Sequence, residues 1–170
     1  MVAVRPSADG PEVLVVERGA GARFLPGYVA FPGGAADDGD AETAGRRFGD
    51  PGEAARACAV RELLEEVGLA LTSDGLRPAA GDGIASVDAS PPSRDQLPRI
   101  AHWIAPEDIP VRFDAQFFAV LAPDGPAPQP DAEEVHAARW ISPRGLLDEW
   151  RSGARKLYWP SYYTVSALAR

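Results

Sequence analysis

The sequence RELLEEVGL, residues 61–69, is the stretch from which the expected fold and function follow. It ends a longer segment, residues 53–67, that is dense in Ala, Leu, Glu and Arg and therefore predicts a helix closed by Gly68. Positions three and four apart are neighbours on a helix, so three carboxylates share one face. They are Glu62, Glu65 and Glu66.

This acidic face needs a partner, because like charges at such a range disfavour one another. Arg61 can pair with Glu65 one turn along, but one guanidinium cannot neutralise three anions. A solvated helix surface is the simple alternative, and E-x-x-E-E alone would favour it. The apolar remainder of the helix and the upstream turn FPGG (residues 31–34) favour a hard divalent cation instead. Oxygen ligands suit Mg²⁺ or Mn²⁺.

Residues 53–69 resemble the Nudix box, the motif of the Nudix hydrolases. In that pattern Gly, five residues, Glu and seven residues precede R-E-U-x-E-E-x-G-U, where U is a bulky aliphatic residue. Residues 61–69 match each fixed position of the second half, and Glu53 stands eight residues before Arg61 as required. The resemblance implies an α/β (α+β) fold, the Nudix α/β/α sandwich with a mixed β-sheet, as one domain over residues 1–170.

One departure concerns the Gly that opens the box, because Arg47 stands at its position, six residues before Glu53. The Gly33-Gly34 pair lies further upstream, and 18 residues separate Gly34 from Glu53 where the family has five. We interpret about 13 of them as an insertion, which a surface loop tolerates at small entropic cost. Residues 35–52 are polar, acidic and Gly-rich, so we predict an insertion loop with at most one weak helical turn.

By this resemblance, Glu62 and Glu66 are expected metal ligands, and Glu65 is a further ligand or a water-orienting group. Water would attack a pyrophosphate bridge, while the cation neutralises phosphate oxygens and activates the nucleophile. Glu53 and Arg61 are expected to orient the helix. The general base varies within the family and stays open here. The catalytic candidates are Glu62, Glu65 and the loop residues Glu133 and Glu134, with Asp114 as a further alternative.

A second motif concerns the substrate. The spacing R-x3-G-x3-F-P-G-G from Arg23 to Gly34, continued by Asp37 and Asp40, resembles the extra motif of coenzyme A diphosphatases. Two residues depart from it, Val16 and Gly19. The resemblance implies cleavage of CoA or acyl-CoA to 3′,5′-ADP and (acyl-)phosphopantetheine. The alternatives are an ADP-ribose or nucleotide-sugar diphosphatase, and a catalytically silent nucleotide-binding module.

The same resemblance predicts the residues that meet the substrate. They are Arg23, Phe31, Gly33 and Gly34. The planar guanidinium of Arg23 suits a phosphate, and pairing with the acidic insertion is the equal alternative. The glycines allow a ligand to approach the backbone closely. The aromatic residues within 158–163 could stack on adenine, but aromatics at helical spacing usually pack in the core, which we favour.

Composition limits the partners. The net charge of −8 disfavours a nucleic-acid groove, and the apolar runs are too short to span a bilayer. The single cysteine, Cys58, excludes an internal disulfide, and the start of the chain shows no apolar leader, so we expect a cytoplasmic location. We expect a small nucleoside-diphosphate substrate, neither nucleic acid nor membrane as partner, and leave a homodimer open.

Apolar and β-branched runs predict the remaining elements. Strands are expected at residues 12–17, 69–72, 83–87, 99–104, 112–121 and 135–141, and helices at 143–150 and 160–169.

Overall fold

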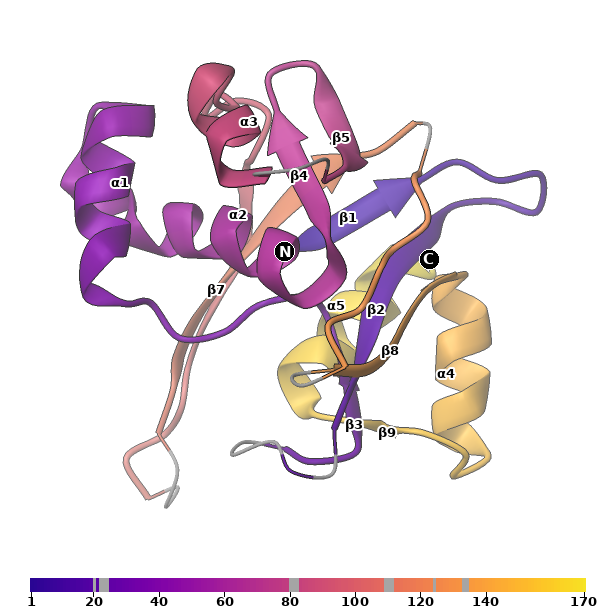
Figure 1. Cartoon of the computed structure of the whole chain (residues 1–170). Coiled ribbons are helices and arrows are strands. Elements are labelled where there is room, and N and C mark those ends of the chain that lie inside the picture. The colour runs from indigo at the N-terminus through magenta and orange to yellow at the C-terminus, as the bar shows by residue number, and fades with distance from the viewer. Residues whose placement is uncertain (20, 22–24, 80–82, 109–111, 124, 133–134) are drawn as a thin grey trace.

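The computed structural model describes residues 1–19, 21, 25–79, 83–108, 112–123, 125–132 and 135–170 (Figure 1). Three residues of the predicted site, Arg23, Glu133 and Glu134, lie outside these ranges.

A mixed sheet of seven strands forms the centre of the fold, in the order β6-β7-β1-β2-β3-β9 and with β8 paired to β2. The β1–β7 and β3–β9 pairs are parallel, and the other pairs are antiparallel. A separate hairpin joins β4 to β5. The strands are β1 (Val2–Arg5), β2 (Glu12–Arg18), β3 (Tyr28–Ala30), β4 (Leu69–Thr72), β5 (Gly75–Pro78), β6 (Arg99–Ile104), β7 (Asp114–Leu121), β8 (Val135–Ile141) and β9 (Lys156–Leu157).

Helices cover both faces of this sheet, which confirms the predicted α/β/α sandwich with a mixed β-sheet. Figure 1 shows α1, α2 and α3 on one side and α4 and α5 on the other. The helices are α1 (Asp38–Phe48), α2 (Ala54–Val67), α3 (Gly83–Ala89), α4 (Pro143–Arg151) and α5 (Trp159–Leu168), and the short 3-10 turn η1 (Pro51–Glu53) precedes α2.

Strand β2 illustrates why both faces are covered, because its alternating side chains enter two different cores. Leu14 lies in the core that contains Leu63 of α2, and Val15 lies in the core that contains Leu146 of α4. The sheet therefore holds α2, and the glutamates on it, in a fixed place above β2.

The predicted helix at residues 53–67 is confirmed as α2, which begins one residue later. Gly68 ends it in the left-handed conformation, with φ of 63°, and its N–H donates to the Leu64 carbonyl at 2.9 Å. The strands predicted at 12–17, 69–72, 99–104, 112–121 and 135–141 and the two C-terminal helices are confirmed to within two residues.

The prediction of an insertion loop at residues 35–52 is wrong, because these residues contain the 11-residue helix α1 and most of η1. Asp37 begins α1, and its side chain accepts hydrogen bonds from the N–H groups of Gly39 and Asp40. The Asp40 carboxylate in turn accepts from the Asp37 N–H, and Gly49 ends the helix with φ of 72°. These two caps outweigh the low helix propensity of the glycines inside α1.

The strand predicted at residues 83–87 is also wrong, because these residues begin α3. Gly83 and Val87 are both buried while the residues between them are exposed, which is the spacing of a helix turn. The short strands β1, β3, β5 and β9 were not predicted, and each has four residues or fewer.

Aromatic residues of α5 pack against other rings, as the favoured interpretation expects. Trp103 stacks on Tyr163 with ring centroids 5.8 Å apart and meets Trp159 edge-on at 5.0 Å. Tyr163 itself is 56% exposed, so this ring lies at the surface and not in the core. In the part of the chain that the structure describes, no helix combines the length and apolar character needed to cross a membrane.

Candidate functional site

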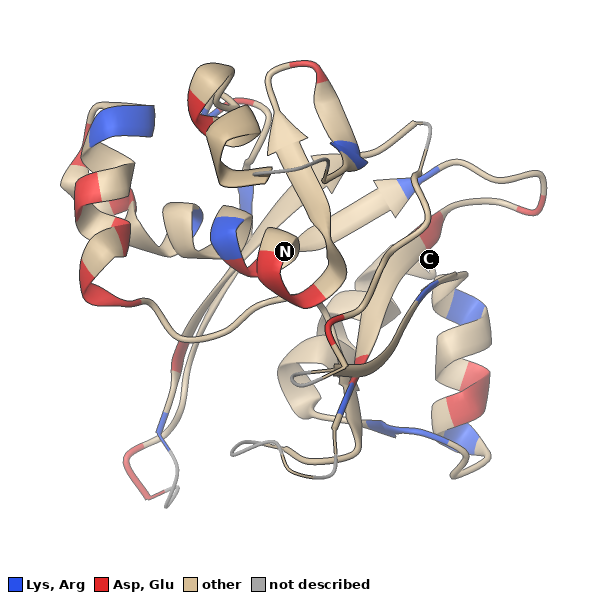
Figure 2. Cartoon of the chain, in the orientation of Figure 1, with Lys and Arg blue, Asp and Glu red and all other residues tan. Residues whose placement is uncertain are grey.

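The three glutamates of the predicted site lie on the C-terminal half of α2 but differ in burial. Glu62 and Glu66 are 8% and 3% exposed, whereas the side chain of Glu65 is 43% exposed. Figure 2 shows acidic segments on this half of α2 and at the start of α1, with a basic segment of α2 between them. The helix thus presents two buried carboxylates and a third at their rim.

The two-glycine turn after β3 lies directly against the buried carboxylates. The Gly33 N–H donates to Glu66 Oε2 at 2.8 Å. A Cβ added to Gly34 would stand 2.4 Å from Glu62 Oε1, so the carboxylate would have to move from its present position. The absence of a side chain at Gly34 therefore allows the Glu62 carboxylate to lie against the backbone of this turn.

Arg61 connects these carboxylates to the insertion. Its Nη1 donates to Glu62 Oε1 at 2.9 Å and to Glu65 Oε2 at 2.6 Å, so the predicted pairing with Glu65 is present. Its Nη2 donates to Asp40 Oδ2 at 3.0 Å and to the Ala35 carbonyl at 3.1 Å. The hydrogen bond to Asp40 is the main cause that raises the pKa of Arg61 above its already high ordinary value. Arg61 is therefore a fixed cation.

Glu66 has an unusual protonation equilibrium. Its pKa is raised from 4.5 to about 7, first by burial and further by the charge of Glu62. The Gly33 N–H, Arg18 at 3.8 Å and the Met1 ammonium act in the opposite sense. A cation beside Glu62 and Glu66 would favour the ionised carboxylates that burial disfavours.

The buried pair suits a magnesium ion. Within the described residues, no three His, Cys, Asp or Glu side chains stand where one ion could contact all of them, and Glu65 points to Arg61 instead. Mg²⁺ keeps several of its waters and is commonly bound through one or two carboxylates. The oxygens of Glu62 and Glu66, held against the Gly33–Gly34 turn, are such a donor set.

Other residues of the predicted site have structural partners. Phe31 is buried and packs its ring edge-on against Phe117, so it anchors the start of the glycine turn in the core. Contact of Phe31 with a ligand stays a prediction. Glu53, which directly precedes α2, accepts a hydrogen bond from Nε of Arg56, the third residue of that helix, at 2.9 Å.

Asp114 is the least favoured of the candidate bases. Its side chain is 63% exposed and lies 2.6 Å from His102 Nε2 on the neighbouring strand. Figure 1 shows that the end of the hairpin where β7 begins extends away from α2. Asp114 therefore lies apart from the two buried glutamates.

Two residues lie near the glutamates in positions that sequence reasoning does not predict, although Asp40 was named as a position of the substrate motif. Asp40 is only 2% exposed and bonds to Arg61, although it belongs to the polar insertion. Arg18 lies beside Glu66, where the pairing register of β2 with β8 shifts between Glu17 and Arg18. The capping pattern around Asp37 could have indicated α1, whereas a strand irregularity has no comparable sequence signal.

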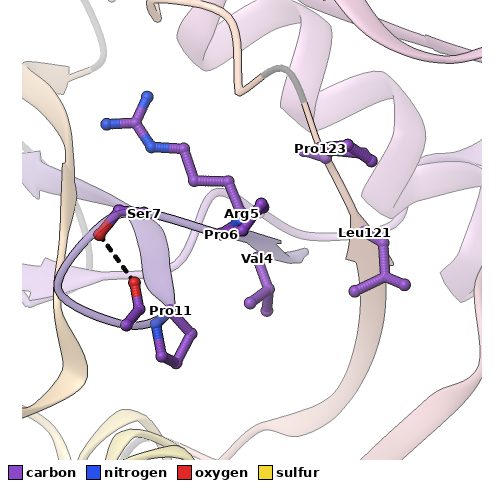
Figure 3. A pocket seen from close by; sticks show the side chains of 9 residues that line it. Val4, Arg5, Pro6, Ser7, Pro11, Leu121 and Pro123 are labelled. Atoms are coloured by element: carbon purple, nitrogen blue, oxygen red, sulfur yellow. Dashed lines mark hydrogen bonds between the residues drawn. The ribbon is translucent and has the colours of Figure 1, made fainter.

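A separate hollow lies between the β1–β2 turn and the end of β7 (Figure 3). Aliphatic and proline side chains form most of its wall, and the Ser7 hydroxyl donates to the Gly10 carbonyl at 2.7 Å beside it. None of the α2 glutamates lines this hollow. It is therefore a different feature from the site on α2.

Comparison with known proteins gives a family. A family model described as the NUDIX domain matches residues 1–159. The curated protein named "Putative nudix hydrolase 7", from Caenorhabditis elegans, is 30% identical over 172 residues, which cover 93% of this chain and 56% of that protein. The chain thus spans about half the length of this relative.

Solved structures agree with the observed fold. The crystal structure of a NUDIX hydrolase from Alicyclobacillus acidocaldarius is 33% identical, with a TM-score of 0.83 over 99% of this chain and 88% of that chain. The NUDIX domain of Shewanella oneidensis NrtR, crystallised with ADP ribose, shares the fold with a TM-score of 0.59 and 16% identity over 97% of this chain and 80% of that chain. The chain therefore belongs to the NUDIX domain family.

Proposed function

We propose that this chain is a divalent-cation-dependent pyrophosphohydrolase that cleaves a nucleoside diphosphate linked to another moiety, with CoA or acyl-CoA as the preferred class. The observation that carries the hydrolase proposal is the buried pair Glu62 and Glu66, held against the Gly33–Gly34 turn. Two adjacent buried carboxylates are costly without a cation, and such an arrangement is typical of catalytic rather than structural positions.

Some residues of the site would hold the cation, and others orient the glutamate side chains. Glu62 and Glu66 would hold Mg²⁺ or Mn²⁺, which when bound neutralises phosphate oxygens and activates water. The Gly33 N–H fixes Glu66, and Arg61 fixes Glu62 and Glu65. Arg18, beside Glu66, adds a guanidinium of the kind that recognises phosphate oxygens. Glu62 and Glu65 remain candidates for the base, as do Glu133 and Glu134 outside the described residues.

The CoA preference rests on the motif from Arg23 to Gly34 and its continuation to Asp37 and Asp40. Part of this motif lies beside the proposed metal site, because Gly33 and Gly34 lie against the glutamates and Asp40 contacts Arg61. The homodimer, the cytoplasmic location, and the lack of nucleic-acid and membrane partners stay predictions.

A substrate panel tests this proposal directly. The protein is incubated with Mg²⁺ and CoA, acetyl-CoA, a long-chain acyl-CoA, ADP-ribose, a nucleotide sugar or a dinucleotide polyphosphate, and products are identified by mass spectrometry. We expect 3′,5′-ADP and phosphopantetheine from CoA, with turnover lost in EDTA and regained with excess Mg²⁺. Rapid ADP-ribose cleavage without CoA turnover would reject the CoA class, and no turnover of any substrate would leave the silent binding module as the better account.

Gly34→Ala should separate catalysis from stability. The added methyl group would displace the end of the Glu62 side chain, which can move at little cost, so unfolding by urea should change by less than about 1 kcal/mol. Because a displaced ligand no longer meets the cation correctly, kcat should fall about 100-fold. Gly45→Ala is the matched control, since a Cβ there meets only Pro51 at 3.6 Å, and its kcat should stay unchanged. Wild-type kcat in Gly34→Ala would show that Glu62 needs no contact with this turn.

A further inference from the structure

We propose that Asp40, a residue of the insertion, is a positioning residue that restrains Arg61 so that Glu62 and Glu65 stay available to the divalent cation. This inference rests on the proposed function, because it concerns the same glutamates. It gives α1 a role in metal binding by α2, in addition to lengthening the segment between Gly34 and Glu53.

Asp40 is built to hold one edge of the Arg61 guanidinium. Asp40 Oδ1 accepts from Arg61 Nε at 3.2 Å, and Asp40 Oδ2 accepts from Arg61 Nη2 at 3.0 Å. This two-point contact has the fork geometry that makes Arg–carboxylate pairs strong and directional. Asp40 exposes only 2% of its surface, so water weakens the contact little.

Local structure keeps the Asp40 carboxylate in place independently of Arg61. Oδ2 also accepts from the Asp37 N–H at 2.9 Å, as part of the capping box of α1. Asp37 reciprocates through its side chain, which accepts from the Asp40 N–H at 3.0 Å. The Asp40 carboxylate is therefore held by the cap of α1 as well as by Arg61.

The contact with Asp40 determines which N–H groups of Arg61 remain for the glutamates. Nε and Nη2 face Asp40, Nη2 also reaches the Ala35 carbonyl, and Nη1 serves Glu62 and Glu65. Nε also lies 3.5 Å from Asp37 Oδ2. Without a charged Asp40, the Nε–Nη2 edge loses its buried anion and keeps only the longer contact of Nε with Asp37, whose side chain is 58% exposed, so the guanidinium can turn to the two glutamates. A guanidinium in full contact with those carboxylates competes with a cation for the same oxygens.

The test measures Mn²⁺ binding without substrate, by electron paramagnetic resonance of the free ion. In Asp40→Asn, the amide oxygen can keep the capping contact to Asp37, while the charge that faces Arg61 is removed. We expect the Mn²⁺ dissociation constant to rise about 10-fold, in the range seen when partners of metal ligands are lost. Asp38→Asn is the matched control, because it removes an exposed charge from the same turn of α1, and its Mn²⁺ affinity should equal the wild type. Equal affinities in the two variants would overturn the proposal.

A second comparison distinguishes positioning from general damage to the fold. In an Arg61→Lys background, which keeps the charge but not the fork, Asp40→Asn should change the Mn²⁺ dissociation constant less than twofold. A 10-fold change that persists there would show that Asp40 does not act through Arg61 and would overturn the proposal. Wild-type protein that binds Mn²⁺ yet cleaves no diphosphate would reject the proposed function alone, whereas wild-type protein that binds no Mn²⁺ would overturn both.

Discussion

Glu66→Gln is expected to lower kcat about 1,000-fold while the protein stays folded. Gln keeps the shape of the side chain and can still accept the Gly33 N–H, which contacts Glu66 Oε2 at 2.8 Å. It loses the negative charge that holds the cation, which contributes several kcal/mol to stabilising transition-state charge. A loss of about 4 kcal/mol corresponds to three decades in rate. The measurement is steady-state hydrolysis of the best substrate from the panel at saturating Mg²⁺.

The same variant should be more stable than the wild type in alkaline, metal-free solution. The folded Glu66 carboxyl titrates near pH 7, whereas its ordinary pKa is 4.5, so between these values the folded protein binds more protons than the unfolded chain. The contribution of Glu66 to stability is therefore present below about pH 4.5 and is lost as the pH rises through 7. The shift corresponds to about 3 kcal/mol. Urea unfolding in EDTA at pH 5 and pH 8 should show this loss in the wild type relative to Glu66→Gln.

Subtracting the pH dependence of Glu66→Gln from that of the wild type separates the effect of Glu66 on stability from the effect of the Met1 ammonium. Burial lowers the pKa of that ammonium to about 6, and its effect on stability has the opposite sign. Glu42→Gln serves as the control for activity, because the Glu42 side chain is 78% exposed and pairs only with Arg46 among the contacts described for it. Retention of more than a tenth of the wild-type kcat in Glu66→Gln would reject Glu66 as a metal ligand.

Arg61→Ala should destabilise the fold by about 3 kcal/mol. The substitution leaves the Asp40 carboxylate buried without the guanidinium that contacts both of its oxygens. Removing one partner of a buried ion pair commonly costs about 3–5 kcal/mol, and we take the lower value because the Arg61 side chain is 21% exposed. For a chain of this size, Tm should fall by about 6–12 °C, measured by circular dichroism.

The control for Arg61→Ala is Arg46→Ala on α1. Arg46 also pairs with a carboxylate, that of Glu42 at 2.7 Å, but their side chains are 55% and 78% exposed. Such a surface pair contributes about 0.5 kcal/mol or less. If both variants lowered Tm equally, the contacts between Arg61 and Asp40 would have no special part in joining α1 to α2.

The predictable part of the site consists of the residues that lie on the single helix α2. Residues 61–69 combine helix-forming composition, a terminal Gly68 and acidic residues at helical spacing, so local rules alone place Glu62 and Glu66 on one face. The central strands were predictable for the same reason, since short Val-rich runs favour buried strands. Residues 53–67 and 135–141 thus appear where they were expected, to within one residue.

The unpredicted part depends on contacts between distant segments. Nothing local in the polar sequence of residues 35–52 indicates that Asp40 is buried, because its burial comes from packing of α1 against α2 and from Arg61, 21 positions later. Glu65 shows the limit of helical spacing, although its pairing with Arg61 was predicted. Helical spacing groups it with Glu62 and Glu66, but its side chain turns to Arg61 and is 43% exposed. Periodicity gives the face on which a residue lies and not the partner to which its side chain turns.

The capped helix in the insertion has a consequence for protein engineering. Transplanting residues 35–52 into a shorter homologue would add a capped helix as well as chain length. The segment contains α1 and the Asp40 carboxylate that here contacts Arg61. Conversely, trimming these residues to the common length would leave that arginine to its neighbouring glutamates. On the proposed role of Asp40, changing the length of this segment would therefore change the affinity of the two glutamates for the divalent cation.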